Sequence, residues 1–250
     1  MTWLLDLDGV VWLAEDAIPG SAEAIAHLRG RGERVVFLTN NSSATIDDYL
    51  AKLDRVGIPT AAGDLITSAQ AAASLVEPGE TALVCAGPGV EQALQARGAR
   101  TVRRGRADAV VVGWHRDFDF DRLTAAFDAV IAGARLIGTN DDATYPTPAG
   151  PLPGGGSILA AVSYATGVEP VVAGKPFGPV VELLQDRVPD PEIMVGDRPT
   201  TDGLLAHRIG VPFALVLSGV TSAGSVPTEP PTAYVARDLA DLVDQRYGRS

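Results

Sequence analysis

Short apolar runs alternate with helical patterns at both ends of this chain. Near the N-terminus, strands are predicted at 3–7, 35–38 and 65–67, and helices at 22–29, 46–56 and 69–75. The pattern returns with strands at 171–172, 192–195 and 213–217, and helices near 180–185 and 203–209. This order predicts an α/β fold with a doubly wound parallel sheet covered by helices on both faces. We expect the two ends of the chain to share that sheet.

The middle of the chain has strands and helices of its own. Strands are predicted at 82–86, 109–112 and 136–138, and helices near 90–97, 122–132 and 157–166. A Pro- and Gly-rich segment, 145–156, precedes the last of these helices, and long irregular loops of this kind are usually functional. We therefore predict a discontinuous core, residues 1–78 plus 173–250, and an inserted α/β domain, residues 79–172.

Composition excludes several classes of protein. The 250 residues are 46% hydrophobic and 20% charged, which is typical of a globular protein with a sizeable core. The net charge of −11 argues against a nucleic-acid partner. Apolar runs are much shorter than the roughly 20 residues of a membrane span, so no membrane partner is expected. The single cysteine, Cys85, lies in an apolar run and is expected in the core, which fits a cytoplasmic protein.

Two carboxylates stand at the end of the first predicted strand. Asp6 and Asp8 point to one side while Leu7 points to the other, with roughly 6–7 Å of backbone between the two acids. Carboxylates in such a place are costly unless they are paired or hold a metal ion. The pair raises the hypothesis of magnesium and phosphoryl transfer, and for these residues alone the alternative, a solvated strand end followed by an Asp-Gly turn, stays open.

Polar residues also follow three other predicted strands. Thr39-Asn40-Asn41 follows 35–38, Lys175 follows 171–172, and Asp197 follows 192–195. Each has a plain explanation as a turn, a helix cap or an exposed lysine. In open α/β sheets, however, ligands bind at the carboxyl ends of the strands. The joint placement on one edge therefore predicts a shared site.

With Asp202, these residues resemble the four ordered motifs of the haloacid-dehalogenase-like (HAD) phosphohydrolases. The inserted domain is similar to their type-2 cap. Within this family, one branch contains NagD, 4-nitrophenylphosphatase and phosphoglycolate phosphatase. The chain resembles this branch in the segments 67–70, 139–142, 153–154 and 174–176. Two residues depart from the pattern of this branch. Asp141 stands where proline is frequent, and Pro199 lies within the segment that carries Asp202.

The resemblance implies a role for each matching residue. Asp6 would attack phosphorus, and Asp8 would protonate the leaving alcohol and then activate water. Mg²⁺ would be held by Asp6, the backbone carbonyl of Asp8 and Asp197, with Asp202 in support. The remaining phosphoryl oxygens would be held by Thr39, Asn40, Asn41 and Lys175.

The cap loop is expected to supply substrate contacts. In the family, the residue before the loop proline reaches substrate, and here it is Tyr145. Asn140 and Asp142 are further candidates, with the alternative that all three only shape the loop. The role of His115, beside Trp114 in the cap, is left open.

The resulting expectation is an Mg²⁺-dependent phosphatase that acts on a small phosphorylated metabolite. A phosphotransferase of the same fold and a non-catalytic phosphometabolite-binding regulator remain alternatives. Asp8 disfavours a dehalogenase, which needs no acid to protonate an alkoxide. The metabolite and the oligomeric state, including a homodimer, are left open.

Overall fold

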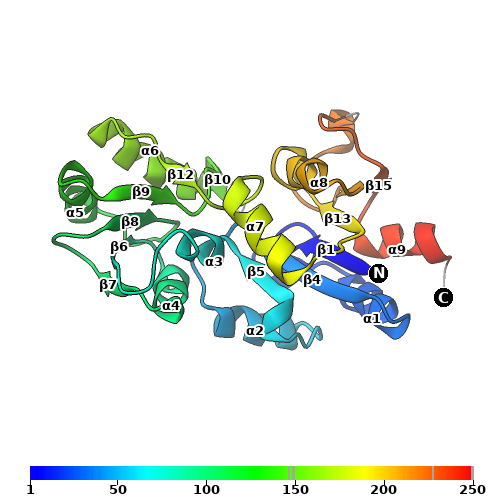
Figure 1. Cartoon of the computed structure of the whole chain (residues 1–250). Helices are drawn as coiled ribbons and strands as arrows, with labels where there is room; N and C mark the ends of the chain where they lie inside the picture. Colours follow the sequence, from blue (N-terminus) through cyan, green and yellow to red (C-terminus); the bar gives the residue numbers. More distant parts are fainter. Residues whose placement is uncertain (146, 148–149, 227, 249–250) are drawn as a thin grey trace.

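The structure of the chain, a computed structural model, describes residues 1–145, 147, 150–226 and 228–248. It has two lobes (Figure 1). The core lobe contains the segments near both termini, and the cap lobe is formed by the middle of the chain.

Six parallel strands form the sheet of the core lobe, in the order β15-β14-β13-β1-β4-β5. Their bounds are Thr2–Asp6 (β1), Arg34–Thr39 (β4), Leu65–Thr67 (β5), Ile193–Gly196 (β13), Phe213–Val216 (β14) and Tyr234–Ala236 (β15). Strand β1 pairs with β4 on one side and with β13 on the other, so the two ends of the chain share one sheet, as expected. The winding direction reverses between β1 and β13, which places the switch point of the sheet beside Asp6.

Alternation along β1 distributes its side chains to both faces of the sheet. Trp3 and Leu5 pack in one apolar cluster, and Leu4 packs in another on the opposite face. The first cluster is covered by α1 (Ser21–Gly30), α2 (Ile46–Arg55) and α9 (Leu239–Tyr247). The second is covered by α3 (Ser68–Ala73), α7 (Gly178–Arg187) and α8 (Leu204–Ile209). Burial on both faces explains the nearly continuous apolar sequence of these strands.

The cap lobe is a second parallel sheet, in the order β12-β9-β8-β6-β7. Its strands are Thr81–Cys85 (β6), Arg100–Val102 (β7), Ala109–Val112 (β8), Arg135–Gly138 (β9) and Val171–Val172 (β12). Helices α5 (Phe120–Ile131) and α6 (Gly155–Thr166) cover one face. On the other face, α4 (Pro88–Ala96) and α3 join the cap to the core through one shared apolar cluster. Cys85 is buried in the cap, as predicted for a core residue.

One predicted strand lies in the other sheet. Val171 and Val172 were grouped with the strands of the core, although the predicted boundary after residue 172 places them in the inserted domain, and they pair with Ile137 and Gly138 of the cap. The two-residue strand is only partly buried, so its sequence does not indicate which sheet it joins. Lys175 therefore follows a strand of the cap and enters the core at the crossover to α7. The division into 1–78 plus 173–250 and 79–172 stays a prediction about folding units.

Two short hairpins extend from the lobes toward each other. The core hairpin is Trp12–Leu13 (β2) with Asp16–Ala17 (β3), and the cap hairpin is Thr144–Tyr145 (β10) with Leu152–Pro153 (β11). Neither was predicted, because two-residue strands leave no apolar periodicity. Among the helices of the described ranges, none combines the length and the apolar character that a membrane crossing requires.

Helix α2 begins with a capping box, which we expect to stabilise the core. Thr45 Oγ1 accepts from the Asp48 amide at 3.1 Å, and Asp48 Oδ2 accepts from the Thr45 amide at 3.0 Å. Replacing Thr45 by Ala should lower the free energy of unfolding by about 1 kcal/mol in urea titrations. The hydrogen bonds from Thr45 lower the pKa of Asp48, so this difference should be present near neutral pH and shrink as the pH falls through that depressed pKa.

Thr124→Ala provides the matched control for this measurement. Thr124 lies inside α5, and its hydroxyl donates to the Phe120 carbonyl at 2.8 Å rather than capping a helix. We expect little change there, because alanine is the better helix former. An equal loss in both variants would contradict the assigned cap.

Candidate active site

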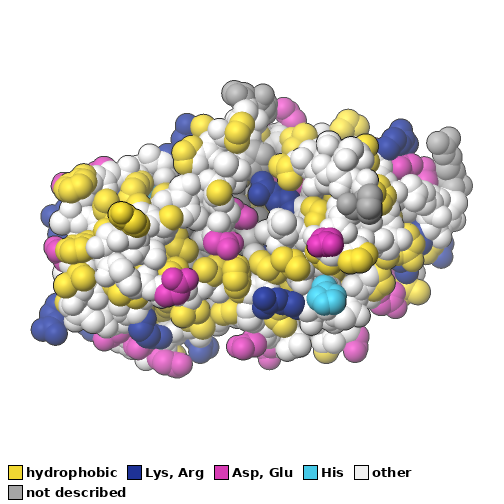
Figure 2. All heavy atoms as spheres, turned by 90° about the horizontal axis from the view of Figure 1, so that it is seen from above, with side chains coloured by type: hydrophobic (Ala, Val, Ile, Leu, Met, Phe, Trp, Pro, Cys, Tyr) yellow, Lys and Arg dark blue, Asp and Glu magenta, His cyan; other side chains and the backbone are white. Residues whose placement is uncertain are grey.

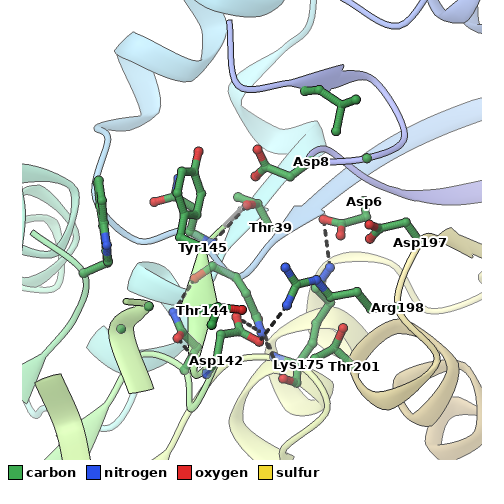
Figure 3. Close-up of a pocket in the computed structure, with 18 residues that line it drawn as sticks. Asp6, Asp8, Thr39, Asp142, Thr144, Tyr145, Lys175, Asp197, Arg198 and Thr201 are labelled. Carbon is green, nitrogen blue, oxygen red and sulfur yellow. Dashed lines mark hydrogen bonds and ion pairs between the residues drawn. The ribbon is translucent and has the colours of Figure 1, made fainter. Parts of the chain in front are cut away.

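Polar side chains from the carboxyl ends of β1, β4 and β13 line one cavity beside the cap (Figure 3). The surface is hollowed between the two lobes, and acidic and basic side chains lie side by side there (Figure 2). The predicted site residues that line the cavity are Asp6, Asp8, Thr39, Asn40, Asn41, Asn140, Asp142, Tyr145, Lys175 and Asp197. The remaining predicted site residue, Asp202, does not line the cavity but forms an ion pair with Lys175. The structure thus brings all of them together, while their roles stay predictions.

Lys175 is buried between two carboxylates. Its Nζ lies 2.9 Å from Asp6 Oδ1 and 2.7 Å from Asp202 Oδ1, and its side chain is 2% exposed. Asp202 is fully buried, and its Oδ2 also accepts from the Arg198 amide at 3.1 Å. Burial by itself lowers the pKa of Lys175, but the carboxylates of Asp202 and Asp6 outweigh it and raise that pKa. The lysine is therefore held as a cation against Asp6.

The acids around Asp6 bring more negative charge than the ammonium of Lys175 offsets. Burial raises the pKa of Asp6 well above the usual range of an aspartate. Lys175 opposes this shift, while the carboxylates of Asp202 and Asp197 add to it. Asp6 Oδ1 is already occupied, because it also accepts from the Leu7 amide at 2.8 Å. A further cation at this point would favour the ionised carboxylate.

Asp197 sits in a cradle of glycines at the end of β13. Its Oδ2 accepts from the Val220 amide at 2.7 Å. A Cβ at Gly9 would lie 2.5 Å from that oxygen and one at Gly219 would lie 1.9 Å from it, so both close approaches require glycine. The other oxygen, Oδ1, is buried and has no hydrogen-bond partner among the described residues. Burial, with Asp202 adding to it, raises the pKa of Asp197 to about 6.

These observations fit a hard divalent cation. Carboxylate oxygens of Asp6, Asp197 and Asp202 lie within 4.8 Å of one another. Asp202 is already engaged by Lys175, which leaves the unpartnered Oδ1 of Asp197 and the carboxylate of Asp6 as the available donors. Mg²⁺ takes oxygen ligands and commonly binds through one or two carboxylates while keeping waters. The residues present therefore suit the magnesium ion that the sequence predicted.

The loop after β4 joins the site to the Lys175 backbone. Asn40 Oδ1 accepts from the Lys175 amide at 2.7 Å, and Asn40 Nδ2 donates to the Lys175 carbonyl at 3.1 Å. Thr39 Oγ1 accepts from the Asn41 amide at 3.1 Å, and Thr39 is 3% exposed. The Asn41 side chain caps the loop by accepting from the Ser43 amide at 3.0 Å. The loop is thereby fixed before any ligand binds.

Asp8 lies across the cavity from Lys175 (Figure 3). Its Oδ1 accepts a hydrogen bond from Trp12 Nε1 at 3.2 Å. Burial raises the pKa of Asp8, and Lys52 and the Trp12 hydrogen bond oppose this shift. A carboxyl with a raised pKa is suited to carry a proton.

The cap residues differ in how much of their side chains is already engaged. Asn140 Nδ2 donates to the Asn40 carbonyl at 2.7 Å, and its Oδ1 accepts from the Asp142 amide at 3.2 Å. Asp142 accepts from Asn40 Nδ2 at 3.2 Å and lies 3.9 Å from the Arg198 guanidinium. Tyr145 packs against Trp114 with ring centroids 5.1 Å apart. Asn140 and Asp142 tie cap to core, whereas Tyr145 faces the open cavity (Figure 3).

A second cavity of about 420 Å³ adjoins the first. Asp8, Asn41, Trp114 and Tyr145 line both. Aromatic and charged side chains from α2, both hairpins and the cap line the rest, including Trp12, Tyr49, Lys52, Arg55 and Arg116. Asp8 therefore stands where a group bound at Asp6 would extend into the larger space.

Sequence reasoning missed several residues of the site. The Asp197 cradle is completed by Gly219 and Val220, which follow β14 at the same edge of the sheet. Ligands bind at the carboxyl ends of the strands, so the residues that follow the predicted strand 213–217 would have been candidates as well. No sequence signal pointed to Trp12. His115 lies buried in the cap outside the two cavities, its Nδ1 within 2.9 Å of the Gly113 carbonyl.

The two departures from the family pattern occupy different places. Pro199 begins a π-helical turn, Pro199–Gly203, that carries Asp202 to Lys175. With proline at position 199, the Asp202 carboxylate still contacts Lys175. Asp141 is exposed next to the buried Asn140.

Comparison with known proteins identifies relatives over nearly the whole chain. The family described as haloacid dehalogenase-like hydrolase matches residues 3–100, and one described as HAD-hydrolase-like matches residues 172–242. The chain is 37% identical over 253 residues to D-glycerol 3-phosphate phosphatase of Mycobacterium tuberculosis, covering 96% of this chain and 70% of the relative. It is 33% identical over 253 residues to an acid sugar phosphatase of Staphylococcus saprophyticus, covering 97% and 96%.

Solved structures agree with these relatives. The 4-nitrophenylphosphatase of Thermotoga maritima superposes with a TM-score of 0.90 at 30% identity, covering 99% of this chain and 97% of that chain. A glycerol phosphate phosphatase of Mycobacterium tuberculosis in complex with magnesium gives a TM-score of 0.88 at 37% identity, covering 96% and 75%. The expected α/β core with a cap and the NagD-like resemblance are confirmed. The chain belongs to the haloacid dehalogenase-like hydrolase family.

Proposed function

We propose that this chain hydrolyses small phosphate monoesters with Mg²⁺, through an aspartyl-phosphate formed on Asp6. One observation carries the proposal. The buried Asp6 carboxylate lies between the cation of Lys175 and the unpartnered oxygen of Asp197, in a cavity that opens toward Asp8. The relatives support it, since those named above include a D-glycerol 3-phosphate phosphatase and an acid sugar phosphatase.

The first half of the reaction forms the covalent intermediate. A carboxylate oxygen of Asp6 bonds to phosphorus while the bond from phosphorus to the ester oxygen breaks. Asp8 gives its proton to that departing oxygen and becomes a carboxylate. Lys175, with the hydroxyl and amide groups of Thr39 and Asn40, stabilises charge on the phosphoryl oxygens as the transition state forms.

The second half regenerates the enzyme. Asp8, now ionised, takes a proton from a water molecule as the water oxygen bonds to phosphorus. The bond from phosphorus to Asp6 breaks, which releases phosphate and restores both Asp6 as a carboxylate and Asp8 as an acid. Two nearby carboxyl groups can divide these roles because their environments differ.

Asp6, Asp197 and the Asp8 backbone carbonyl would hold the magnesium ion. When bound, Mg²⁺ would supply positive charge beside the phosphoryl oxygens and the Asp6 carboxylate, and this charge would offset the three neighbouring acids, Asp8, Asp197 and Asp202. Asp202 keeps Lys175 in place rather than binding the ion. The net charge of −11 makes this local compensation necessary for an anionic substrate.

The leaving group would occupy the second cavity, which begins at Asp8. Its volume of about 420 Å³ exceeds the space that a small polyol fills, and its lining includes the aromatic side chains of Trp12, Tyr49, Trp114 and Tyr145. Curated relatives include a dihydroxyacetone phosphatase of Corynebacterium glutamicum and a 5'-nucleotidase of Bacillus subtilis. We propose a small phosphorylated metabolite in this size range, with Tyr145 at the boundary of the two cavities as its contact.

Two alternatives and the cellular setting are open to direct test. Transfer to another acceptor would compete with water, so a phosphotransferase would make less phosphate when alcohols are added. A binding regulator would keep its ligand in Asp6→Asn. We propose cytoplasmic action without nucleic-acid or membrane partners, supported by the acidic charge and the single buried cysteine. The oligomeric state, including a homodimer, is left open.

Replacing Asp6 by Asn should abolish turnover. Phosphate release from glycerol 3-phosphate, sugar phosphates, dihydroxyacetone phosphate and nucleoside monophosphates should fall by about 10⁴-fold or more, because the amide is a poor nucleophile. Asp54→Asn, at an exposed position of α2, is the matched control and should keep wild-type rates. Phosphate release that survives in Asp6→Asn would refute the covalent mechanism.

Magnesium should stabilise the folded protein through Asp197. At about 100 times its dissociation constant, Mg²⁺ should raise the unfolding temperature by roughly 5–10 °C in a thermal-shift experiment. Asp197→Asn should lose most of this shift, since it removes the free oxygen in the cradle, and Asp54→Asn should retain it. Equal shifts in both variants would place the ion elsewhere.

Replacing Lys175 by Met should destabilise the fold as well as stop catalysis. The fully buried Asp202 loses its ion pair, and such a loss costs about 3–5 kcal/mol of unfolding free energy. The double variant Lys175→Met/Asp202→Asn removes the unpaired charge, so denaturant titrations should recover part of the loss while activity stays absent. If the double variant is no more stable than the single one, Asp202 is not the partner that matters.

A further inference from the structure

The loop between Asp6 and the first hairpin turns back on itself. Gly9 has a φ of +82°, and its amide donates to the Trp12 carbonyl at 2.8 Å. The amides of Val11 and Trp12 donate to the Leu7 carbonyl at 2.8 and 3.2 Å. This closed loop returns the Trp12 side chain to Asp8, four residues earlier in the chain.

The Trp12 indole is held rigidly beside Asp8. It is 1% exposed and stacks on the Tyr49 ring with centroids 6.5 Å apart and an interplanar angle of 9°. Tyr49 is itself fixed, because its hydroxyl donates to the Asn41 carbonyl at 2.8 Å. Lys52 Nζ lies 4.3 Å from the indole ring centroid, a cation–π contact. Two residues of α2 thus determine the plane of the indole.

This plane directs the indole N–H at one carboxyl oxygen. Trp12 Nε1 lies 3.2 Å from Asp8 Oδ1. An indole nitrogen donates and never accepts, so Oδ1 must act as the acceptor. In a protonated carboxyl group the carbonyl oxygen is the better acceptor, and the hydroxyl is then formed by the other oxygen.

We infer that Trp12 is a positioning residue for Asp8, whose N–H keeps the acidic proton on Oδ2 and aimed at the departing ester oxygen. The inference rests on the proposed function, in which Asp8 protonates the leaving group. In that step the Oδ2–H bond breaks, the proton joins the ester oxygen as its bond to phosphorus breaks, and Oδ1 keeps the indole hydrogen bond throughout. Trp12 itself touches neither phosphorus nor the ester oxygen in this step.

The inference has a consequence that a merely structural tryptophan would not have. An alkyl phosphate releases a strongly basic alkoxide and needs the proton, whereas 4-nitrophenyl phosphate releases a weak base and barely needs it. Loss of the indole N–H should therefore slow alkyl esters selectively. Asp8 becomes a carboxylate as it gives up its proton, and a hydrogen bond to a charged group contributes about 1.5–3 kcal/mol, equivalent to roughly 10- to 100-fold in rate.

The experiment compares Trp12→Phe with wild type on glycerol 3-phosphate, phenyl phosphate and 4-nitrophenyl phosphate. We expect kcat/KM to fall by about 10- to 100-fold for the alkyl ester and by less than about threefold for the nitrophenyl ester, with phenyl phosphate between them. Trp3→Phe is the matched control, because Trp3 is fully buried in β1 and its Nε1 has no hydrogen-bond partner in the described part of the chain. It should leave the slope against leaving-group basicity unchanged.

An isostere protects the test against misfolding. Benzothienylalanine at position 12, in a Trp3→Phe/Trp114→Phe background, keeps the shape of the indole and has sulfur in place of the N–H. It should reproduce the selective loss relative to the same background with tryptophan. An equal loss on all three esters, or no loss, would overturn the inference.

Asp8→Asn separates failure of the inference from failure of the proposed function. It should show a steeper dependence on leaving-group basicity than Trp12→Phe. If Asp8→Asn is steep and the Trp12 variants are flat, the role of Trp12 is wrong while the phosphatase mechanism stands. If Asp8→Asn is also flat, Asp8 is not the acid, and the inference fails with its premise.

Discussion

The charge balance around Lys175 is the constraint on which this site depends. One buried ammonium faces Asp6 and Asp202, and two further acids, Asp8 and Asp197, stand near the same point. Burial of so many carboxylates is unfavourable unless cations offset them. Lys175 offsets part of the charge through its ion pairs with Asp6 and Asp202. Part of the negative charge that Lys175 does not offset lies on Asp197. The unpartnered Oδ1 of Asp197 identifies where a second cation is needed.

The chain assembles this cluster by bringing strand ends together. Asp6 ends β1 and Asp197 follows β13, which pair directly in the core sheet. Lys175 arrives differently, from a crossover that leaves the cap sheet. The amide of Asn40 holds the backbone of Lys175 on both its N–H and its carbonyl, so a residue outside the sheet reaches the edge of the sheet with fixed geometry.

Residue pattern predicted the parts of the structure that repeat. Apolar runs indicate strands that are buried on both faces, and the polar residues after each run mark the end of the strand. Asp6, Thr39 and Asp197 could therefore be placed on one edge of the sheet. Val171 and Val172 could not be assigned to a sheet, because a half-exposed two-residue strand carries no preference. Trp12 was missed for a related reason. Its position depends on a closed loop and on stacking against Tyr49, neither of which leaves a periodic signal in the sequence.

The same contacts separate the Lys175 cluster from the cap side chains that line the larger cavity. Asn40 Nδ2 donates to the Lys175 carbonyl in the crossover and to Asp142 in the cap. Movement of the cap loop would break the bond to Asp142 but leave both bonds to the Lys175 backbone, and it would not touch the ion pair with Asp202. Lys175 would therefore keep its place against Asp6 if the loop moved. Tyr145 and Trp114, by contrast, would move with the cap, so the walls of the larger cavity can change while the cluster around Lys175 stays constant.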